Sequence, residues 1–277
     1  MCLLIATVAL LCTGFGARSE DLKASETENI DIWCKQLSDE LMSVNYGRCI
    51  KRKWVIDSYS PGGHPIPYFD WGKPDSRHRI LVLGAIHADE ISAISLTFRW
   101  LDFADRQPHD SLVRDYRFLF YPLINPDGFH IKPRTRTNSN GIDINRNFET
   151  KGWNRTAHSY WRNKASSDPR RFPGGKAGSE IETQTVQKTV ETFKPQLIIS
   201  VHAPYKVLDH DGPVTFTDTG LSPLPVRKLG GFPGSLGTYA GIERNTPVIT
   251  PELPSATTLP NSKVVESLFI FILKSRF

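Results

Sequence analysis

A histidine and two carboxylates, His87, Asp89 and Glu90, follow an apolar run in the stretch LVLGAIHADEISA, residues 81–93. Imidazole and carboxylate groups can bind metal ions or carry protons, so this cluster could support either chemistry. The spacing of His87 and Glu90 is weak evidence by itself. With 8 His and 29 acidic residues in 277, an acidic residue three positions after a histidine is expected 8 × 29/277, or about 0.8 times, by chance. A functional site therefore needs partners elsewhere in the chain.

Polar residues of suitable types follow the other apolar runs of the chain. Four runs are apolar on both faces, which is typical of inner strands of a sheet covered on both sides: residues 80–86, 116–124, 195–201 and 246–250. The segment NPDG (125–128) follows the second run, His202 follows the third, and Glu252 follows the fourth. Because open α/β sheets bind ligands beyond the carboxyl ends of their strands, we expect these side chains to share one crevice.

His87, Glu90 and His202 have the residue types and the spacing of a catalytic zinc site. Two ligands close in sequence and one distant ligand commonly hold the metal, with a fourth position open to water. Taken singly, a histidine at a strand end is more often a hydrogen-bonded structural residue, and a glutamate early in a helix is often only stabilised by the helix dipole. The coincidence of all three at strand ends favours a Zn²⁺ site. We expect Asp89 to support the turn or the helix start, not to bind the metal.

Strands alternate with helices along the chain, which predicts an α/β fold: a three-layer α/β/α sandwich with a mixed, mostly parallel central sheet. Helices are expected at 89–106 and 178–193, the second with a capping box of Ser179 and Glu182. An amphipathic helix is predicted at 30–44, with Ile32, Trp33, Leu37, Leu41 and Val44 on its apolar face. Turns around a short edge strand are expected at 60–78, and a long functional loop region at 125–177.

The net charge of +5 and the isoelectric point near 9.0 indicate a mildly basic protein. Such a charge could favour an anionic substrate or surface, although a solvated basic surface is the commoner explanation. No run of Lys and Arg interleaved with aromatic residues, no zinc-finger spacing and no basic helix is present. We therefore expect no nucleic-acid partner.

Residues 1–16, MCLLIATVALLCTGFG, contain no charged residue, and the chain then becomes polar abruptly. The run is too short to span a bilayer and suits a signal peptide, with small residues that permit cleavage before Ala17. The usual positive charge at its start is missing, and Cys12 lacks the small preceding residues of a lipoprotein cysteine. Alternatives are a misassigned start and an uncleaved anchor. Export predicts a periplasmic or secreted protein without a stable membrane span after signal removal.

Removal of the signal peptide would leave two of the four cysteines, Cys34 and Cys49, fifteen residues apart. An even pair in an oxidising compartment suggests one disulfide. Two buried free thiols are the alternative, and the residues alone do not decide between them.

Five segments bear a specific resemblance to a known family. HADE (87–90), NPDG (125–128), RTNSNGIDINRNF (136–148), SVH (200–202) and TPEL (250–253) have the order and spacing found in M14-type zinc carboxypeptidases. GSEIET (178–183) and PGSLGTY (233–239) are similar to segments of the bacterial murein peptide amidase A group. The resemblance covers roughly residues 45–277. It implies a zinc carboxypeptidase-like catalytic domain over 45–277, preceded by a signal peptide at 1–16 and a helical extension at 17–44.

The resemblance also implies a role for each matching residue. His87, Glu90 and His202 match the zinc ligands, and Glu252 matches the general base that takes a proton from the zinc-activated water and passes it to the leaving amine. Three further roles are implied: Arg136 stabilises the developing oxyanion, Asn145 and Arg146 bind the terminal carboxylate of the substrate, and Asp143 orients the first histidine ligand.

Three positions depart from the pattern of the resembling proteins. Ala88 replaces a common glycine, which is a conservative change, and Ala203 replaces an aspartate beside the second histidine. Gly230 stands where a tyrosine usually contacts the bound peptide. Phe232 and Tyr239 are nearby aromatic residues, but neither matches that position. These departures concern the substrate pocket and not the metal chemistry.

The resemblance implies a zinc metallocarboxypeptidase that hydrolyses peptidoglycan stem peptides at the bond between γ-D-Glu and diaminopimelate. An N-acyl amino acid deacylase of the aspartoacylase and succinylglutamate desuccinylase type is an alternative, because those enzymes share the ligand set. The segments at 125–128 and 178–183 favour the peptidase. A third possibility, prompted by Gly230, is a wall-binding relative without activity, which the intact ligands and Glu252 disfavour.

Overall fold

The computed structural model describes residues 15–214 and 222–275, with side chains from residue 25 onward. Most of the predicted signal peptide at 1–16 therefore lies outside the described residues. Among the described residues, seven strands form one sheet in the order β1-β2-β4-β3-β5-β7-β6. Their bounds are β1 Val55–Tyr59, β2 Pro65–Gly72, β3 His78–Leu83, β4 Tyr116–Tyr121, β5 Leu197–Ser200, β6 Val207–Asp211 and β7 Val248–Glu252.

The four central strands, β4, β3, β5 and β7, are parallel; β2 pairs antiparallel with β4, and the edge strands β1 and β6 pair antiparallel with β2 and β7. The prediction of a mixed sheet with a parallel centre is confirmed, and each of the four apolar runs forms one of the central strands. β6 was not predicted, because three of its five residues, Asp209, His210 and Asp211, are polar.

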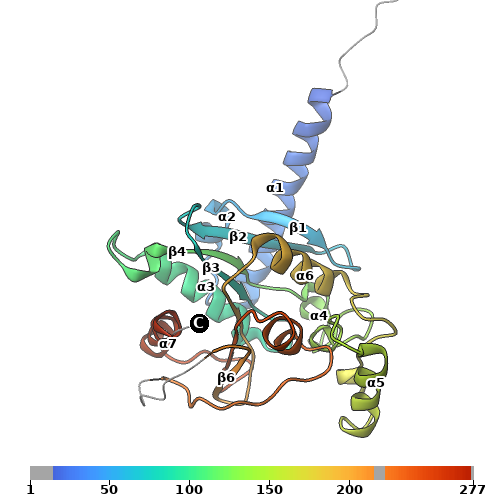
Figure 1. The fold of residues 1–277 in the computed structure, drawn as a ribbon. Coiled ribbons are helices and arrows are strands. Elements are labelled where there is room, and N and C mark those ends of the chain that lie inside the picture. Colours follow the sequence, from blue (N-terminus) through green and yellow to red (C-terminus); the bar gives the residue numbers. More distant parts are fainter. Residues whose placement is uncertain (1–14, 215–221, 276–277) are drawn as a thin grey trace, which may run out of the picture.

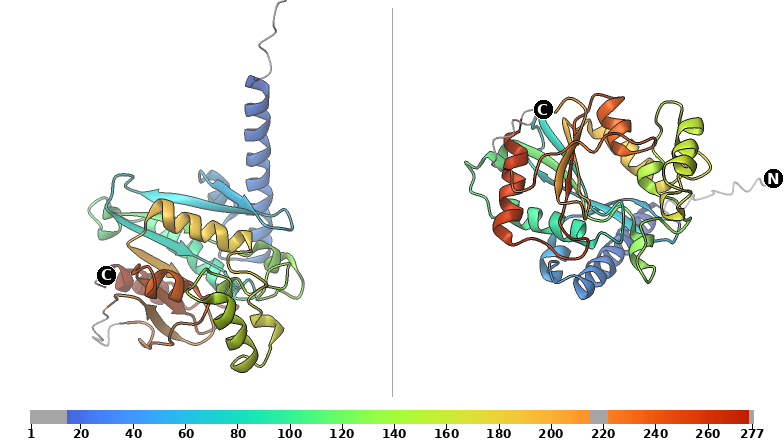
Figure 2. Two further views of the ribbon diagram at one scale, coloured as in Figure 1. Left: turned by 45° about the vertical axis from the view of Figure 1, so that its right-hand side comes forward. Right: turned by 90° about the horizontal axis from the view of Figure 1, so that it is seen from below.

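Alternate side chains of each central strand enter two hydrophobic cores, one on each face of the sheet. On β3, Ile80 and Val82 face one core, and Leu81 and Leu83 face the other. The first core is covered by α3 (Ile91–Asp105), α7 (Ser262–Lys274) and the C-terminal part of α1 (Phe15–Glu40); the second is covered by α6 (Ile181–Phe193) and the π-helical turn η4 (Gly237–Ile242). Figure 1 shows this arrangement, and Figure 2 shows α7 beside α3. The three-layer sandwich is confirmed.

The segment predicted as a loop at 125–177 contains short helices. They are α4 (Pro126–His130), the 3₁₀ turns η2 (Ile144–Arg146) and η3 (Pro169–Arg171), and α5 (Trp153–Asn163). The remaining short elements are α2 (Tyr46–Lys51) and the 3₁₀ turn η1 (Leu112–Asp115). The prediction of a long loop region did not include these helices, because α5 is mostly polar and buries only Trp153 and Ala157.

The N-terminal helix is longer than predicted and ends earlier. α1 runs from Phe15 to Glu40, and its N-terminal half extends away from the rest of the chain (Figures 1 and 2). Trp33 and Leu37 are buried in the first core, whereas Ile32 is 47% exposed and does not belong to the predicted apolar face. Among the described residues, no helix combines the length and the apolar character that a membrane span needs.

Cys34 of α1 and Cys49 of α2 form a disulfide, which decides between the two alternatives left open above. Both residues are fully buried in the first core. The extension before residue 45 is therefore attached to the body of the protein by a covalent bond as well as by packing.

The predicted capping box of α6 is wrong. Glu180 occupies the N-cap position without a side-chain cap, and the Ser179 hydroxyl donates to the Glu180 carboxylate at 2.6 Å. Glu182 accepts a hydrogen bond from Asn138 Nδ2 at 3.3 Å, and its Oε1 is buried without a partner. Ser179 thus bonds the adjacent N-cap residue and Glu182 bonds Asn138 of a distant segment, so the two side chains do not form a capping box.

We expect reduction of the Cys34–Cys49 disulfide to lower the free energy of unfolding by about 3 kcal/mol, because the bond closes a loop of about fifteen residues in the unfolded chain. Urea unfolding with and without reductant measures the change. A Cys34→Ala, Cys49→Ala double variant serves as the control and should not respond to reductant. Two titratable thiols in the oxidised, denatured protein would contradict the disulfide.

Glu182 makes stability depend on pH. Burial raises the pKa of Glu182 to about 7 from an ordinary value of 4.5. The folded state favours the neutral carboxyl, so its contribution to stability is fully present below pH 4.5 and is lost as the pH rises through about 7. The loss amounts to about 3 kcal/mol.

We therefore expect Glu182→Gln to be more stable than the parent at pH 8, and the difference to shrink as the pH falls to 4.5. Urea unfolding at both pH values measures it. Glu191→Gln is the matched control, because Glu191 lies exposed on the same helix. An equal difference at the two pH values would show that folding does not raise the pKa of Glu182.

Candidate active site

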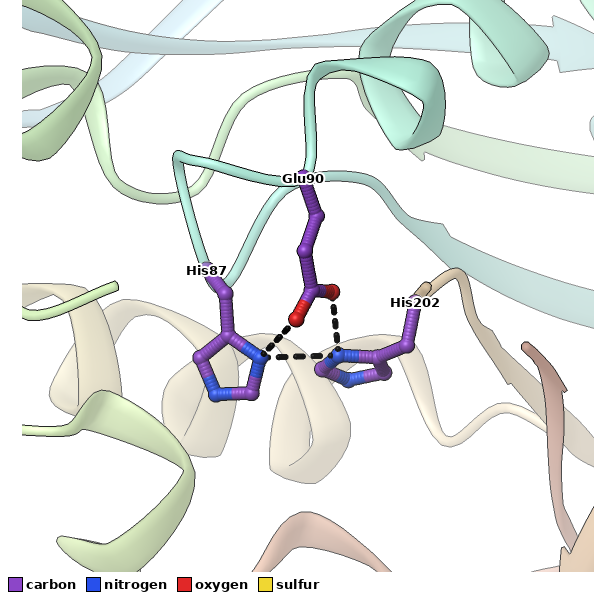
Figure 3. A group of neighbouring side chains, drawn as sticks. All are labelled: His87, Glu90 and His202. Atoms are coloured by element: carbon purple, nitrogen blue, oxygen red, sulfur yellow. Dashed lines mark hydrogen bonds and ion pairs between the residues drawn. The ribbon is translucent and has the colours of Figure 1, made fainter. Parts of the chain in front are cut away.

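His87, Glu90 and His202 point their ligand atoms at one another. The two Nδ1 atoms are 3.0 Å apart, His87 Nδ1 is 3.0 Å from Glu90 Oε1, and His202 Nδ1 is 3.0 Å from Glu90 Oε2 (Figure 3). All three residues are buried. Among the described residues, no other trio of His, Cys, Asp or Glu side chains gathers in this way.

The turn after β3 places the first two of these residues. The backbone hydrogen bonds between β3 and β4 continue past Leu83, since the Gly84 N–H donates to the Tyr121 carbonyl at 2.7 Å. A Cβ on Gly84 would lie 2.8 Å from Thr97 Oγ1 and even closer to the Pro122 carbonyl oxygen, so this approach requires glycine. The chain then turns and begins α3 with Glu90 at the N-cap position, which brings the carboxylate back over the end of the strand.

Hydrogen bonds behind the cluster fix both imidazole rings. His87 Nε2 lies 3.1 Å from Asp143 Oδ1, and His202 Nε2 lies 3.2 Å from Ser200 Oγ. A carboxylate can only accept, so the contact with Asp143 favours the tautomer with the proton on His87 Nε2, which leaves the Nδ1 lone pair for a metal ion. Glu90 Oε2 accepts the Ala203 N–H at 3.1 Å. The ligand atoms are therefore held in place by the protein itself.

The arrangement fits a zinc ion. Tetrahedral bonds of about 2.0–2.1 Å separate neighbouring ligand atoms by about 3.3 Å, close to the separations in this cluster. Two imidazole lone pairs and a carboxylate that converge in a buried place repel each other unless a cation lies between them. Two nitrogen ligands and one oxygen ligand leave a fourth position for water, as in catalytic zinc sites.

Asp143 and Arg136 form the layer of charge behind His87. Arg136 Nε donates to Asp143 Oδ2 at 2.9 Å, and Arg136 Nη1 lies 3.6 Å from Glu90 Oε1. Burial alone would raise the pKa of Asp143, but the Arg136 guanidinium and the His87 ring outweigh it and hold that pKa well below its ordinary value. Asp143 also accepts the Asn145 N–H at 3.0 Å and so caps η2. The Asp143 carboxylate thereby links the metal cluster to Asn145 and Arg146 on η2.

Asn145 and Arg146 lie on η2 with their polar groups available to a ligand. The Leu236 N–H donates to Asn145 Oδ1 at 2.8 Å, which leaves the amide NH₂ without a partner among the described residues. The Arg146 guanidinium lies over the Phe232 ring, 4.8 Å from its centroid, and its Nε is buried without a partner. Burial lowers the pKa of Arg146. An anion such as a carboxylate would satisfy these donors.

Glu252 is the last residue of β7 and lies beside the metal cluster. A parallel β-bridge joins it to His202, and its Oε2 is buried without a hydrogen-bond partner. Burial raises the pKa of Glu252. A carboxylate of this kind is suited to exchange a proton with a neighbouring water molecule.

One cavity of about 510 Å³ brings all the predicted site residues together. They are His87, Glu90, Arg136, Asn145, Arg146, His202 and Glu252. Residues that the sequence reasoning missed also line it: Ser200, Asp209, Asp211 and Phe232 among them. Ser200 could have been found from its place two residues before His202 on the same strand. Asp209 and Asp211 lacked such a signal, because β6 was not predicted.

The structure also corrects the expectation for Asp89. The Asp89 Oδ2 accepts a hydrogen bond from Arg170 Nη2 of η3 at 2.7 Å. Asp89 therefore holds η3 at the mouth of the cavity and does not cap α3. Gly230 is one of the three positions that depart from the pattern of the resembling proteins. It has a φ of +89°, and a Cβ there would meet nothing within 4 Å, so this side of the cavity is open. Phe232 lines the cavity, whereas Tyr239 is buried in the second core.

We expect Asp143→Asn to lower zinc affinity 10- to 100-fold, because an amide can donate to His87 Nε2 and move the imidazole proton to Nδ1. Competition with a chelator of known affinity measures the change. Asp70→Asn is the control, since Asp70 of β2 forms a partly exposed ion pair with Arg117 of β4. Unchanged zinc affinity in Asp143→Asn would mean that Asp143 does not fix the tautomer of the His87 ring.

Comparison with known proteins agrees with this geometry. The chain matches the family described as Zinc carboxypeptidase over residues 55–211, more than half of its length. It is 30% identical to murein peptide amidase A of Escherichia coli strain K12 over 198 residues, which cover 69% of this chain and 77% of the relative. The corresponding protein of Vibrio campbellii is 29% identical over 202 residues, with 69% and 75% covered.

Solved structures show the same architecture. The crystal structure of murein-tripeptide amidase from E. coli O157 superposes with a TM-score of 0.57 at 26% identity, covering 79% of this chain and 91% of that one. Carboxypeptidase A from Helicoverpa armigera has a TM-score of 0.55 at 16% identity, with 89% and 70% covered, and shares the fold. The sequence match and the buried His87, Glu90 and His202 cluster together show that the chain belongs to the zinc carboxypeptidase family and is a zinc-dependent hydrolase.

Proposed function

We propose that this protein is a carboxypeptidase that hydrolyses peptidoglycan stem peptides at the bond between γ-D-Glu and diaminopimelate. The observation that carries the proposal is the single cavity in which the His87, Glu90 and His202 cluster, Glu252, and the Asn145–Arg146 pair all lie. The names of the murein peptide amidase relatives support the choice of substrate class.

In this proposal His87, Glu90 and His202 hold the zinc ion. When bound, the ion polarises the scissile carbonyl and lowers the pKa of a water molecule. Asn145 and Arg146 bind the terminal carboxylate of the substrate through the donors that have no partner in the protein. This contact limits cleavage to the last residue of a chain.

Glu252 and Arg136 act on the reacting atoms. Glu252 accepts a proton at Oε2 as the water oxygen bonds to the carbonyl carbon, and returns a proton to the amine nitrogen as the C–N bond breaks. The guanidinium of Arg136, already held by Asp143, stabilises the negative charge that develops on the carbonyl oxygen. The products are a shortened peptide and an amino acid with a free ammonium group.

We also propose that the protein acts outside the cytoplasm, in the periplasm or as a secreted protein, after removal of residues 1–16. The apolar run at the N-terminus supports this placement. The Cys34–Cys49 disulfide supports it independently, because such bonds persist in oxidising compartments. Residues 17–44 would then form the helical start of the mature protein, followed by a catalytic domain over 45–277.

Incubation of the zinc-loaded protein with muramyl-free tripeptide and tetrapeptide stems, followed by mass spectrometry, tests the activity. We expect release of diaminopimelate from the tripeptide, in which it is the last residue, and loss of turnover with chelator. Glu252→Gln should lower kcat by a factor of about 10² to 10⁴ with its zinc content retained, because the variant cannot accept the proton. Glu266→Gln, a change on the distant helix α7, is the control.

Two outcomes would contradict different parts of the proposal. Turnover of ordinary peptides without cleavage of stems would refute the substrate class. Cleavage of N-acyl amino acids in preference to every peptide would favour the deacylase.

A further inference from the structure

We propose that Glu40, the last residue of helix α1, is a positioning residue for Arg136. Glu40 holds Lys132 and Arg134 in the segment 131–136, and Arg136 at the end of that segment acts on the reacting atoms. The inference rests on the proposed function, since it concerns how Arg136 is kept in place. Helix α1 lies outside residues 55–211, the range that matches the family, so this contact comes from a part of the chain that the match does not cover.

One carboxylate oxygen of Glu40 accepts hydrogen bonds from two cationic side chains. Glu40 Oε2 accepts Lys132 Nζ at 2.6 Å and also accepts Arg134 Nη2. Both cations lie over the ring of the buried Phe129, with Lys132 Nζ 5.0 Å and the Arg134 guanidinium carbon 4.6 Å from its centroid. Among the described residues, Glu40 is the only hydrogen-bond or ion-pair partner that these two cationic side chains have outside residues 126–137.

Without the Glu40 carboxylate, two like charges would share one aromatic ring and repel each other. The Glu40 side chain is 31% exposed and the Arg134 side chain is 22% exposed, so solvent would screen this repulsion only in part. Phe129 is fixed in the close-packed first core, so the ring cannot move to separate the charges. The segment 131–136 would therefore have to shift.

Helix stability does not account for a carboxylate at this position. The carboxyl-terminal end of a helix carries partial negative charge, which disfavours a glutamate there and favours a cation. The last turn of α1 contains no basic residue. Asp39 pairs with Lys35 of the same helix at 2.5 Å, whereas Glu40 pairs with the segment that leads to Arg136. The cations of that segment offset the unfavourable position of Glu40.

Helix α1 is fixed well enough to act as a support. Leu37 and Leu41, on either side of Glu40, are both buried in the first core. Cys34, one turn earlier, is bonded covalently to Cys49 of α2. The Glu40 carboxylate is therefore held by the body of the protein and does not move freely with solvent.

At the end of the segment, Arg136 makes contacts that depend on its exact position. The Arg136 carbonyl accepts Asn125 Nδ2 at 3.3 Å. Arg136 Nε donates to Asp143 at 2.9 Å, and Nη1 lies 3.6 Å from Glu90 Oε1. Stabilisation of an oxyanion requires a donor within about 3 Å of the developing charge. Because only one residue separates Arg134 from Arg136, a shift of the first would displace the second and lower the rate.

The test compares Glu40→Gln with Asp39→Asn, a matched control at the neighbouring residue of the same helix. Both zinc-loaded variants are assayed with the tripeptide stem at a temperature where both are folded. A misplaced group can cost up to about 10²-fold in rate, and we expect Glu40→Gln to lower kcat about tenfold without a change in KM. KM should not change because Asn145 and Arg146 still bind the substrate. Asp39→Asn should keep the parent kcat.

A double-variant cycle distinguishes positioning from a merely structural role. If Glu40 acts through Arg136, Glu40→Gln should have no further effect on kcat in an Arg136→Ala background. Arg134→Gln should reproduce the effect of Glu40→Gln, because it breaks the same contact. An equal loss of kcat in both backgrounds, or an unchanged kcat in Glu40→Gln alone, would overturn the inference.

Hydrogen–deuterium exchange separates this result from failure of the proposed function. The Thr135 N–H donates to the Gly128 carbonyl at 3.1 Å, and it should exchange about fivefold faster in Glu40→Gln but at the parent rate in Asp39→Asn. If no peptide is cleaved but exchange rises in this way, the proposed reaction fails and the support of the segment by Glu40 stands. If exchange is the same as in the parent, the inference fails whatever the turnover.

Discussion

In the centre of the sheet, β3 pairs in parallel with β5, and β5 pairs with β7, so the carboxyl ends of three strands from distant parts of the chain lie side by side. The ladder continues past the strands, because the His202 N–H donates to the Pro251 carbonyl at 2.9 Å and the Leu253 N–H donates to the His202 carbonyl at 2.7 Å. A slip of one residue would turn each side chain to the opposite face. The register of these strands thus places His202 beside Glu252 and opposite the turn that carries His87.

The charges at this edge of the sheet depend on one another. Asp143 orients His87, and Arg136 keeps Asp143 ionised. Asp143 also caps the turn that presents Asn145 and Arg146, so the metal cluster and the carboxylate site share one buried carboxylate. Since water is largely excluded, each of these interactions is stronger than it would be at the surface, and each unpaired group is more costly. A zinc ion would supply the positive charge that the His87, Glu90 and His202 cluster leaves unbalanced.

Edge elements shape the pocket around this centre. β6 adds two aspartates on one side, η4 packs against them through glycines, and Phe232 lies over Arg146 on the other side. Gly230 and Ala203 have little or no side chain, so the cavity stays open where a tyrosine and an aspartate are common in the resembling proteins. The residues proposed for zinc binding and proton transfer lie at or just beyond the ends of the central strands, and Arg136 lies in the loop before η2.

The sequence by itself determined the central strands and the layers, and it named the residues that we propose for zinc and for the substrate carboxylate. Long apolar runs and the RTNSNGIDINRNF segment are local signals, and they need no knowledge of distant partners. Only the tertiary structure decided the Cys34–Cys49 bond, the edge strand β6 and the failure of the Ser179 capping box. For the disulfide, for β6 and for Glu182, which bonds Asn138, the outcome depends on which remote residue comes within bonding distance. Asp211 shows the reason most clearly: a polar residue on an edge strand carries no signal of burial until η4 covers it.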